Sequence, residues 1–172
     1  MSIAAQSLPD ALCQTLRLNA AVVAAFGDTY NSTLTIAQNA LAGNVSKFWS
    51  DYADQVAQPY LVFEEVGESY EFMTRAGGLK VNFTSPGVMV CRIINSGRAV
   101  ARSLGILVCN ALNDAEQEGV TWIGFDSPVI SCTLDSIRMK QAAFVPDPDI
   151  GPSQPATFNR LITFDYWYQG QL

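Results

Sequence analysis

Apolar residues recur at helical spacing near the start of the chain. Leu8, Leu12 and Leu16 follow one another at intervals of four, which places them on one face of a helix. Ser7 is a favourable N-cap for that helix, and the residues after it include a proline and an acid, both of which suit a first turn. A second, shorter helix is predicted over 20–26, with Asn19 as its cap and a glycine after it.

The clearest helical pattern covers about 96–113, with Ser96 as its predicted N-cap. The pattern predicts a buried face made of Val100, Leu104, Leu107, Val108 and Ala111. A further helix is predicted over 46–56, because its aromatic and apolar residues also fall at helical spacing. Residues 29–44 show no regular pattern.

The remaining apolar segments are rich in β-branched and aromatic residues, or alternate with polar ones. They predict strands at 60–66, 70–74, 79–84, 88–94, about 129–139 and 158–168. A turn is expected at Ser85, Pro86 and Gly87, and a proline-rich loop at about 145–156. This order of elements favours one α+β domain that spans residues 1–172. We expect a mostly antiparallel sheet with the 96–113 helix packed on one face, plus the N-terminal helices.

The composition narrows the classes of function. The 172 residues suit one domain with a substantial core, and 15% charged residues with a mean hydropathy of +0.14 argue against disorder. The chain has no histidine, which excludes serine–histidine and cysteine–histidine nucleophile pairs and histidine-containing zinc sites. Its four cysteines are scattered and form no C-x-x-C, as expected for small core residues in a reducing compartment.

The net charge of −6 disfavours binding to duplex DNA or to an anionic membrane surface. Residues 1–10 do not resemble a signal peptide, and the longest apolar run, 20–26, is far shorter than a membrane span.

Motifs for catalysis and for cofactors are weak. Glu64 and Glu65 are adjacent in a predicted strand, so they face opposite ways and cannot act as a pair. Asp147 and Asp149 lack the spacing of a calcium loop, and the neighbouring glycines Gly77 and Gly78 belong to no nucleotide-binding motif. We therefore expect no cofactor and no metal, and a carboxylate-dependent hydrolase is a weak alternative.

Charges are segregated along the chain. Residues 28–71 hold seven acids and one base, whereas residues 72–113 hold five bases and no acid. If the two stretches lie on different sides of the domain, they favour a head-to-tail contact between copies, which closes into a ring when the rotation permits. Alternatively, the two stretches neutralise each other within one copy.

Several segments together resemble a known family. The segment 10–28 is similar to the opening of the tail-completion, or tail-terminator, proteins of long-tailed bacteriophages. The segment 58–65 resembles that family's proline-aromatic strand start, and 88–104 resembles its strand leading into a helix with arginine and alanine. The family's last strands and its Asp/Pro/Gly-rich loop correspond to 129–139, 147–155 and 158–168. The sequence departs from the family in a long insert at about 29–58.

The resemblance implies a non-enzymatic structural protein of the virion tail or neck, present in the host cytoplasm during assembly. Family members form a ring, usually a hexamer, at the head-proximal end of the tail tube, where they bind the tube protein and a head-side connector. Genome DNA passes through the lumen without specific binding. Another neck or minor tail component, or a soluble module that binds a ligand or peptide, remains as an alternative.

Two groups of residues are candidates for these contacts. Charge segregation favours Arg98 and Arg102 as contacts to acids of a neighbouring subunit, namely Glu64, Glu68 and Glu71. The loops that hold Gly77, Gly78, Asp147 and Asp149 are candidates for contact with partners.

Overall fold

A single α+β domain is seen in the computed structural model of the chain, which describes residues 5–50, 57–68, 71–74, 81–95, 97–112, 120–126, 129–146 and 158–171. Four helices lie within this part of the chain: α1 (Leu8–Arg17), α2 (Ala20–Phe26), α3 (Ile36–Leu41) and α4 (Arg98–Leu112). The strands are β1 (Phe48–Ser50), β2 (Tyr60–Glu68), β3 (Glu71–Thr74), β4 (Val81–Asn95), β5 (Thr121–Asp126), β6 (Val129–Pro146) and β7 (Phe158–Gln171).

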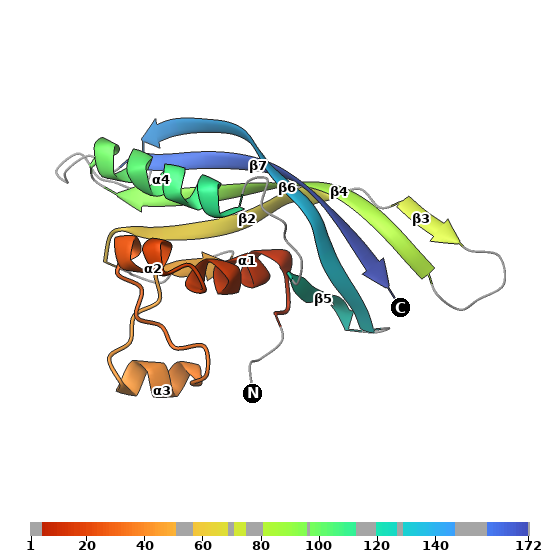
Figure 1. Ribbon diagram of the computed structural model, residues 1–172, viewed down its shortest axis with the longest axis horizontal. Helices are drawn as coiled ribbons and strands as arrows, with labels where there is room; N and C mark the ends of the chain where they lie inside the picture. The colour runs from red at the N-terminus through yellow and green to blue at the C-terminus, as the bar shows by residue number, and fades with distance from the viewer. Residues whose placement is uncertain are drawn as a thin grey trace.

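All seven described strands form one curved sheet in the order β1-β2-β4-β7-β6-β5, with β3 paired to the first part of β4 (Figure 1). Every pairing is antiparallel except that of β1 with β2. The predicted α+β class with a mostly antiparallel sheet is therefore confirmed. In Figure 1, β3 and the first half of β4 extend past the helices.

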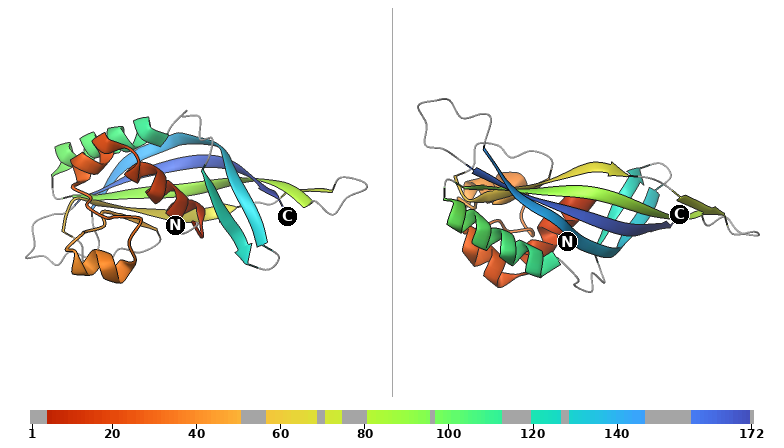
Figure 2. Two further views of the ribbon diagram at one scale, coloured as in Figure 1. Left: turned by 60° about the horizontal axis from the view of Figure 1, so that its bottom comes forward. Right: turned by 90° about the horizontal axis from the view of Figure 1, so that it is seen from above.

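Helices α1, α2 and α4 lie against one face of the sheet (Figure 2). Helix α4 packs on β4 and β7, while α1 packs on β1 and β2 and reaches β5. Alternate strand residues point to that face and are fully buried, as the two-residue period of a strand requires. Examples from neighbouring strands are Phe63, Cys91, Ile93, Phe164 and Tyr166.

The caps predicted for the first two helices are confirmed. The Ser7 hydroxyl accepts a hydrogen bond from the Asp10 backbone N–H, and the Asn19 side chain accepts two from the start of α2. Helix α2 ends at Gly27, whose φ of 68° lies in the left-handed region that glycine adopts without strain.

The prediction of a helix over 46–56 is wrong for residues 46–50, the part of this segment that the structure describes. Residues 48–50 form β1, which pairs with β2 from Leu61 to Phe63, and residues 51–56 lie outside the described part of the chain. The Phe48 ring packs against Phe26 of α2 in an edge-to-face contact with 5.2 Å between centroids. Tertiary packing and a sheet partner thus override the helical spacing of the aromatic residues.

The turn predicted at residues 85–87 is also wrong, because β4 runs through it as one 15-residue strand. Pairing of β4 with β2 ends at Gly87, and pairing with β3 begins at Thr84, so Ser85 and Pro86 pair with β7 alone. A proline is tolerated where one side of the strand has no partner. The predicted strands at 79–84 and 88–94 are therefore one element.

Helix α4 confirms the helix predicted at 96–113, but its buried face is rotated from the prediction. Leu104 and Val108 are buried as expected, whereas Val100 is 49% exposed and Ala101, Gly105 and Leu112 face the sheet instead. A Cβ at Gly105 would lie 3.3 Å from the Ile162 side chain. Because Gly105 has no side chain, α4 can approach β7 closely on this side, and the face of α4 that holds Gly105 is the buried one.

One strand boundary and one whole strand in the last third of the chain also differ from prediction. Strand β6 continues to Pro146, past the predicted end near 139, and β5 forms where no strand was predicted. Most of the predicted proline-rich loop, from residue 147 onward, lies outside the described residues.

Candidate assembly surfaces

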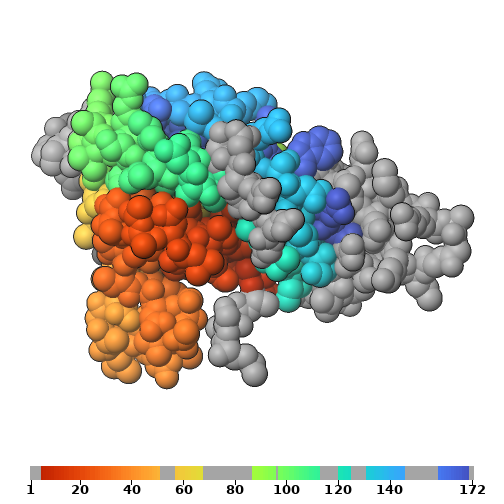
Figure 3. Space-filling model, in the orientation of Figure 1, coloured from red at the N-terminus to blue at the C-terminus, as the bar shows by residue number. Residues whose placement is uncertain are grey.

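The segment between α2 and β1 forms a separate lobe, which we call the arm and define as residues 29–46. In the space-filling view the arm stands away from the rest of the molecule (Figure 3). It contains α3, which begins with a capping box in which Thr35 and Gln38 bond to each other's backbone. This Thr–x–x–Gln spacing is a signal that could have predicted the helix from the sequence.

The arm is built around a buried polar side chain. Asn39 is 3% exposed, and its amide nitrogen donates to the backbone oxygens of Asn31 and Thr35 at 2.9 and 3.1 Å. Its side-chain oxygen accepts from the Asn31 backbone N–H at 2.9 Å and from the Asn44 side chain at 3.0 Å. These bonds satisfy both ends of the Asn39 amide, so they fix one conformation of the arm.

A buried ion pair attaches the arm to the body. The Arg17 Nε lies 3.4 Å from Asp28 Oδ2, and their side chains are 14% and 1% exposed. Arg17 also donates to the Ser46 hydroxyl and to the Phe48 carbonyl, at 2.8 and 2.9 Å. Asp28 accepts from the Lys47 backbone N–H at 2.6 Å. The two ends of the arm are therefore held together and to α1.

The outer surface of the arm carries no charge and exposes two large aliphatic side chains. Leu41 is 89% exposed and Ile36 is 79% exposed, and among the large apolar side chains of the described residues only Leu18, at 87%, is comparable. No charged residue occurs anywhere in residues 29–46.

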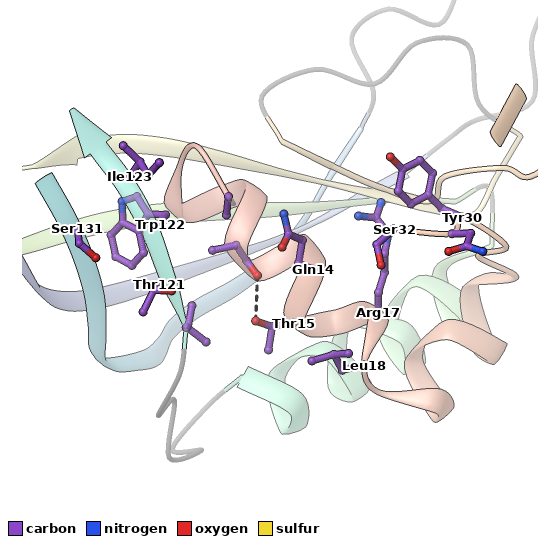
Figure 4. Close-up of a pocket in the computed structure, with 14 residues that line it drawn as sticks. Gln14, Thr15, Arg17, Leu18, Tyr30, Ser32, Thr121, Trp122, Ile123 and Ser131 are labelled. Carbon is purple, nitrogen blue, oxygen red and sulfur yellow. Dashed lines mark hydrogen bonds between the residues drawn. The ribbon is translucent and has the colours of Figure 1, made fainter. Parts of the chain in front are cut away.

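An open groove of about 640 Å³ lies between α1 and β5, next to the base of the arm (Figure 4). Gln14, Thr15 and Leu18 form one wall, and Trp122 with its neighbours on β5 forms the other. Tyr30 and the two residues after it close one end. Arg17, already paired with Asp28, is the one charged residue among the described residues that line the groove.

Arg98 and Arg102, the predicted basic contact residues, lie one turn apart in the first half of α4, and both are exposed. The guanidinium carbon of Arg98 lies 6.0 Å from the centre of the Phe144 ring, and that of Arg160 lies 4.6 Å from the same ring. Together Arg98, Arg102 and Arg160 form a basic surface, which we call the α4 basic patch.

The predicted acidic partners are only partly described. Glu64 lies on β2, where its carboxylate forms a half-exposed ion pair with Arg92 at 3.2 Å. This pair shows that some of the acidic and basic stretches neutralise each other within one copy. Glu68 ends β2 and Glu71 begins β3, and both pair with β4 through the backbone, but their side chains lie outside the described part.

Four further candidates lie outside the described residues: Gly77, Gly78, Asp147 and Asp149. On the sheet face opposite α4, Lys140 and Asp165 form a second exposed ion pair at 3.4 Å. Trp167, next to this pair on β7, is 48% exposed.

Within the described part of the chain, no group of three or more acidic or cysteine side chains is placed to hold a metal ion. Nor does that part contain a helix long and apolar enough to cross a membrane. All four cysteines are described, and none of them forms a disulfide. Burial raises the pKa of the Cys91 thiol well above its ordinary value, and burial also raises that of Cys109, partly offset by Arg160 nearby.

Sequence reasoning identified the basic residues and the insert that contains the arm, but it predicted neither the helix in the arm nor the groove. The sequence signal for the arm is the long run without a charged residue, in a chain where 15% of residues are charged. The groove has no local signal, because its walls come from segments about one hundred residues apart.

No protein-family model and no curated protein matches this chain. Among solved structures, the chain is similar to one in a structure described as "Virion of native gene transfer agent (GTA) particle". The two share 14% sequence identity with a TM-score of 0.50, and the match covers 92% of this chain and 91% of the other. At this identity the match shows a shared fold.

Proposed function

We propose that this chain is a non-enzymatic structural protein of a phage-like virion, which forms a ring at the head-proximal end of the tail tube. The observation that carries the proposal is the fold match, which spans nearly the full length of both chains, to a protein solved within a virion particle. The resemblance of several segments to tail-terminator proteins supports the same role independently.

The α4 basic patch is the first candidate for the contact between neighbouring subunits. Arg98 and Arg102 are both exposed and lie one turn apart on α4, so two positive charges stand close together on the surface of the helix. We propose that they face Glu68 and Glu71 of the next subunit. Glu64 contributes less, because Arg92 already balances its charge. Exposed charge pairs of this kind guide association and fix its register more than they add affinity.

The loops that hold Gly77, Gly78, Asp147 and Asp149 are then candidates for contact with the tube protein and with the head-side connector. The net charge of −6 is compatible with a lumen through which DNA moves, because a negative surface does not hold phosphates.

The decisive experiment measures tube polymerisation. The tube protein of the same virion is polymerised with and without this protein, and tube lengths and ends are recorded by electron microscopy. We expect shorter tubes that carry a ring at one end. Tubes of unchanged length with bare ends would refute the proposed role.

A double variant, Arg98→Glu with Arg102→Glu, tests the subunit contact separately. We expect it to lower the ring mass in light scattering at low salt, as high salt does for the unmodified protein. The charge-conserving variant Arg98→Lys with Arg102→Lys is the matched control and keeps the ring. A ring mass that is identical for all variants and at all salt concentrations would show that the contact lies elsewhere.

A second candidate function is a soluble module that binds a peptide, which the groove between α1 and β5 favours. Its walls combine the Trp122 and Tyr30 rings with polar groups such as Gln14, as is common in ligand sites. A monomer that binds short uncharged peptides and leaves tube length unchanged would support this function in place of the first.

A further inference from the structure

The Arg160 side chain is held between β6 and α4. Arg160 on β7 pairs directly with Phe144 on β6, and its guanidinium carbon lies 4.6 Å from the centre of the Phe144 ring. Its Cγ packs against Gly105 of α4, where a Cβ would lie only 3.4 Å away. Because the ring holds the guanidinium and the glycine leaves room for the stem, the charge of Arg160 is placed before any ligand arrives, which reduces the entropy lost on binding.

Arg160 has no hydrogen-bond acceptor among the described residues. Its side chain is partly buried, and its Nε is buried without a hydrogen-bond partner. None of the ion pairs between described residues involves Arg160. A charged donor that has lost water without gaining an acceptor costs free energy, and native proteins leave few such groups. An anion at this position would supply the missing acceptor, so the orphaned Nε indicates a ligand.

Two further arginines lie along the same edge of α4. Arg98, Arg102 and Gly105 follow one another at intervals of four and three, so they form one stripe on the helix surface. Gly105 lies against Arg160. The Arg98 guanidinium carbon lies 6.0 Å from the centre of the Phe144 ring, and exposed Arg102 is between the two on the stripe. Three guanidinium groups thus gather at the edge where α4 meets β6 and β7 (Figure 1).

The size of this cluster selects among anions. A protein that holds a nucleic acid neutralises about 6–10 phosphates, which three arginines in a chain of net charge −6 do not match. A carboxylate is planar and accepts two parallel N–H bonds from one guanidinium, and the other two arginines then attract further acids nearby. The cluster therefore fits a short acidic segment of a protein.

We propose that the α4 basic patch binds a short acidic segment of a partner protein, and that Arg160, placed on the Phe144 ring, is the residue that anchors one carboxylate. Arg98 and Arg102 are exposed and guide the approach of the segment, since exposed charges contribute more to association than to affinity. The inference deepens the subunit contact proposed above and rests on it for the source of the segment. The ligand chemistry itself is a property of the single chain, so it can be tested without a ring.

The probe is tetraglutamate, acetylated and amidated at its ends, which is titrated at low salt against the isolated chain. Nuclear magnetic resonance of the arginine Nε–H groups follows each arginine separately. We expect the Arg160 signal to shift in a saturable way, and tetraglutamine, which has the same length without charge, to leave it in place. Arg160→Gln should raise the dissociation constant about tenfold, as loss of hydrogen bonds to a charged group does.

Two variants separate this site from general effects. Arg138→Gln removes the same charge, but Arg138 pairs with Asp165 and lies on the face of the sheet opposite α4. It should change the dissociation constant by less than about twofold, because exposed charges at a distance are screened. Phe144→Leu keeps every charge but removes the ring that holds Arg160, and it should weaken binding about threefold. An unchanged thermal midpoint in each variant excludes misfolding as the cause.

Cys109 provides a second readout inside the chain. It lies on the same stripe of α4, four residues after Gly105, and it is the one cysteine of four that is not buried. Burial raises the pKa of this thiol, and Arg160 nearby offsets part of that rise. A carboxylate bound to Arg160 cancels the offset, so tetraglutamate should shift the pH profile of iodoacetamide alkylation to higher pH. Blocked access alone would lower the rate without moving the midpoint, and Arg160→Gln should abolish the shift.

Four results would overturn the inference. The first is the absence of a saturable shift of the Arg160 signal. Equal affinity of the Arg160→Gln and Arg138→Gln variants would show that the peptide responds to overall charge alone. Tighter binding of a thymidine oligonucleotide of equal charge would assign the patch to nucleic acid. Binding that appears only after Asp147→Asn with Asp149→Asn would show that carboxylates of the same chain take the place of the ligand. None of these results affects the tube-length experiment, so the virion role and this site stand or fall separately.

Discussion

Replacement of Gly87 by alanine tests the packing at the centre of the sheet. Gly87 on β4 lies directly opposite Tyr166 on β7, and the Tyr166 side chain is fully buried. A Cβ at this glycine would lie 2.3 Å from Cζ of the tyrosine ring and 2.4 Å from its hydroxyl oxygen, far inside ordinary contact. The ring can relieve the clash only by moving against a close-packed core.

The expected magnitude follows from two opposing effects. Overpacking of a core costs about 1–3 kcal/mol, and a clash with a fully buried ring belongs at the upper end. Loss of glycine stabilises the folded state by about 0.4–1 kcal/mol through the unfolded chain. We therefore expect Gly87→Ala to lower the free energy of unfolding by about 2 kcal/mol, which for this chain length lowers the thermal midpoint by about 4–8 °C.

Urea denaturation followed by circular dichroism gives the measurement, with an unchanged m-value as the sign that two-state unfolding is preserved. The control is Gly67→Ala, at an exposed glycine on β2 where a Cβ would have no atom within 4 Å. It should be neutral or slightly stabilising. In a Tyr166→Leu background the cost of Gly87→Ala should largely disappear. The reasoning would be refuted if Gly87→Ala and Gly67→Ala were equally stable. It would also be refuted if Gly87→Ala lowered the free energy of unfolding by the same amount in the Tyr166→Leu background as in the unmodified protein.

Two further predictions concern buried charged groups and thiols. Arg17→Met should lower the free energy of unfolding by about 3–5 kcal/mol, because it leaves Asp28 buried without its partner, and Asp28→Asn in the same chain should restore part of the loss. Hydrogen exchange should then be faster in the arm, whereas unchanged exchange would contradict its attachment by this pair. Above about pH 8.5, stability should fall as pH rises, by up to about 1.4 kcal/mol per pH unit for one thiol. The reason is that the Cys91 thiol, whose pKa is raised by burial, stays protonated in the folded state while it ionises in the unfolded one. Urea denaturation from pH 7 to pH 10 measures this slope, and Cys91→Val should reduce it; an identical slope in that variant would contradict the assignment.

The features predictable from the sequence were those set by local pattern. Ser7 and Asn19 cap their helices because capping depends on residues within one turn. The strand at the start of β2 was equally clear from its β-branched and aromatic residues. Patterns of this kind involve only neighbours along the chain, so the sequence alone is enough to recognise them.

The errors came from long-range contacts. Phe48 lies in a strand because Phe26 and Leu61 hold it there, and neither is near it in sequence. Gly87 looked like part of a turn, but it is a site where the Tyr166 ring crosses the strand from almost eighty residues away. For the candidate site, exposed Arg98 could be predicted from its helix position, whereas the groove depends on how α1 and β5 are brought together.

The two ends of the arm are bonded to each other, which has a consequence for how the sequence of this protein can evolve. Thr29 donates through its backbone to the Val45 carbonyl at 3.1 Å, and the Val45 N–H donates back to the Thr29 hydroxyl at 2.8 Å. The arm thus leaves the body and returns to it at one point, so its length and surface can be replaced without shifting either α2 or β1. Such an exchangeable module lets related proteins keep a common sheet while they acquire different binding partners through a single insertion.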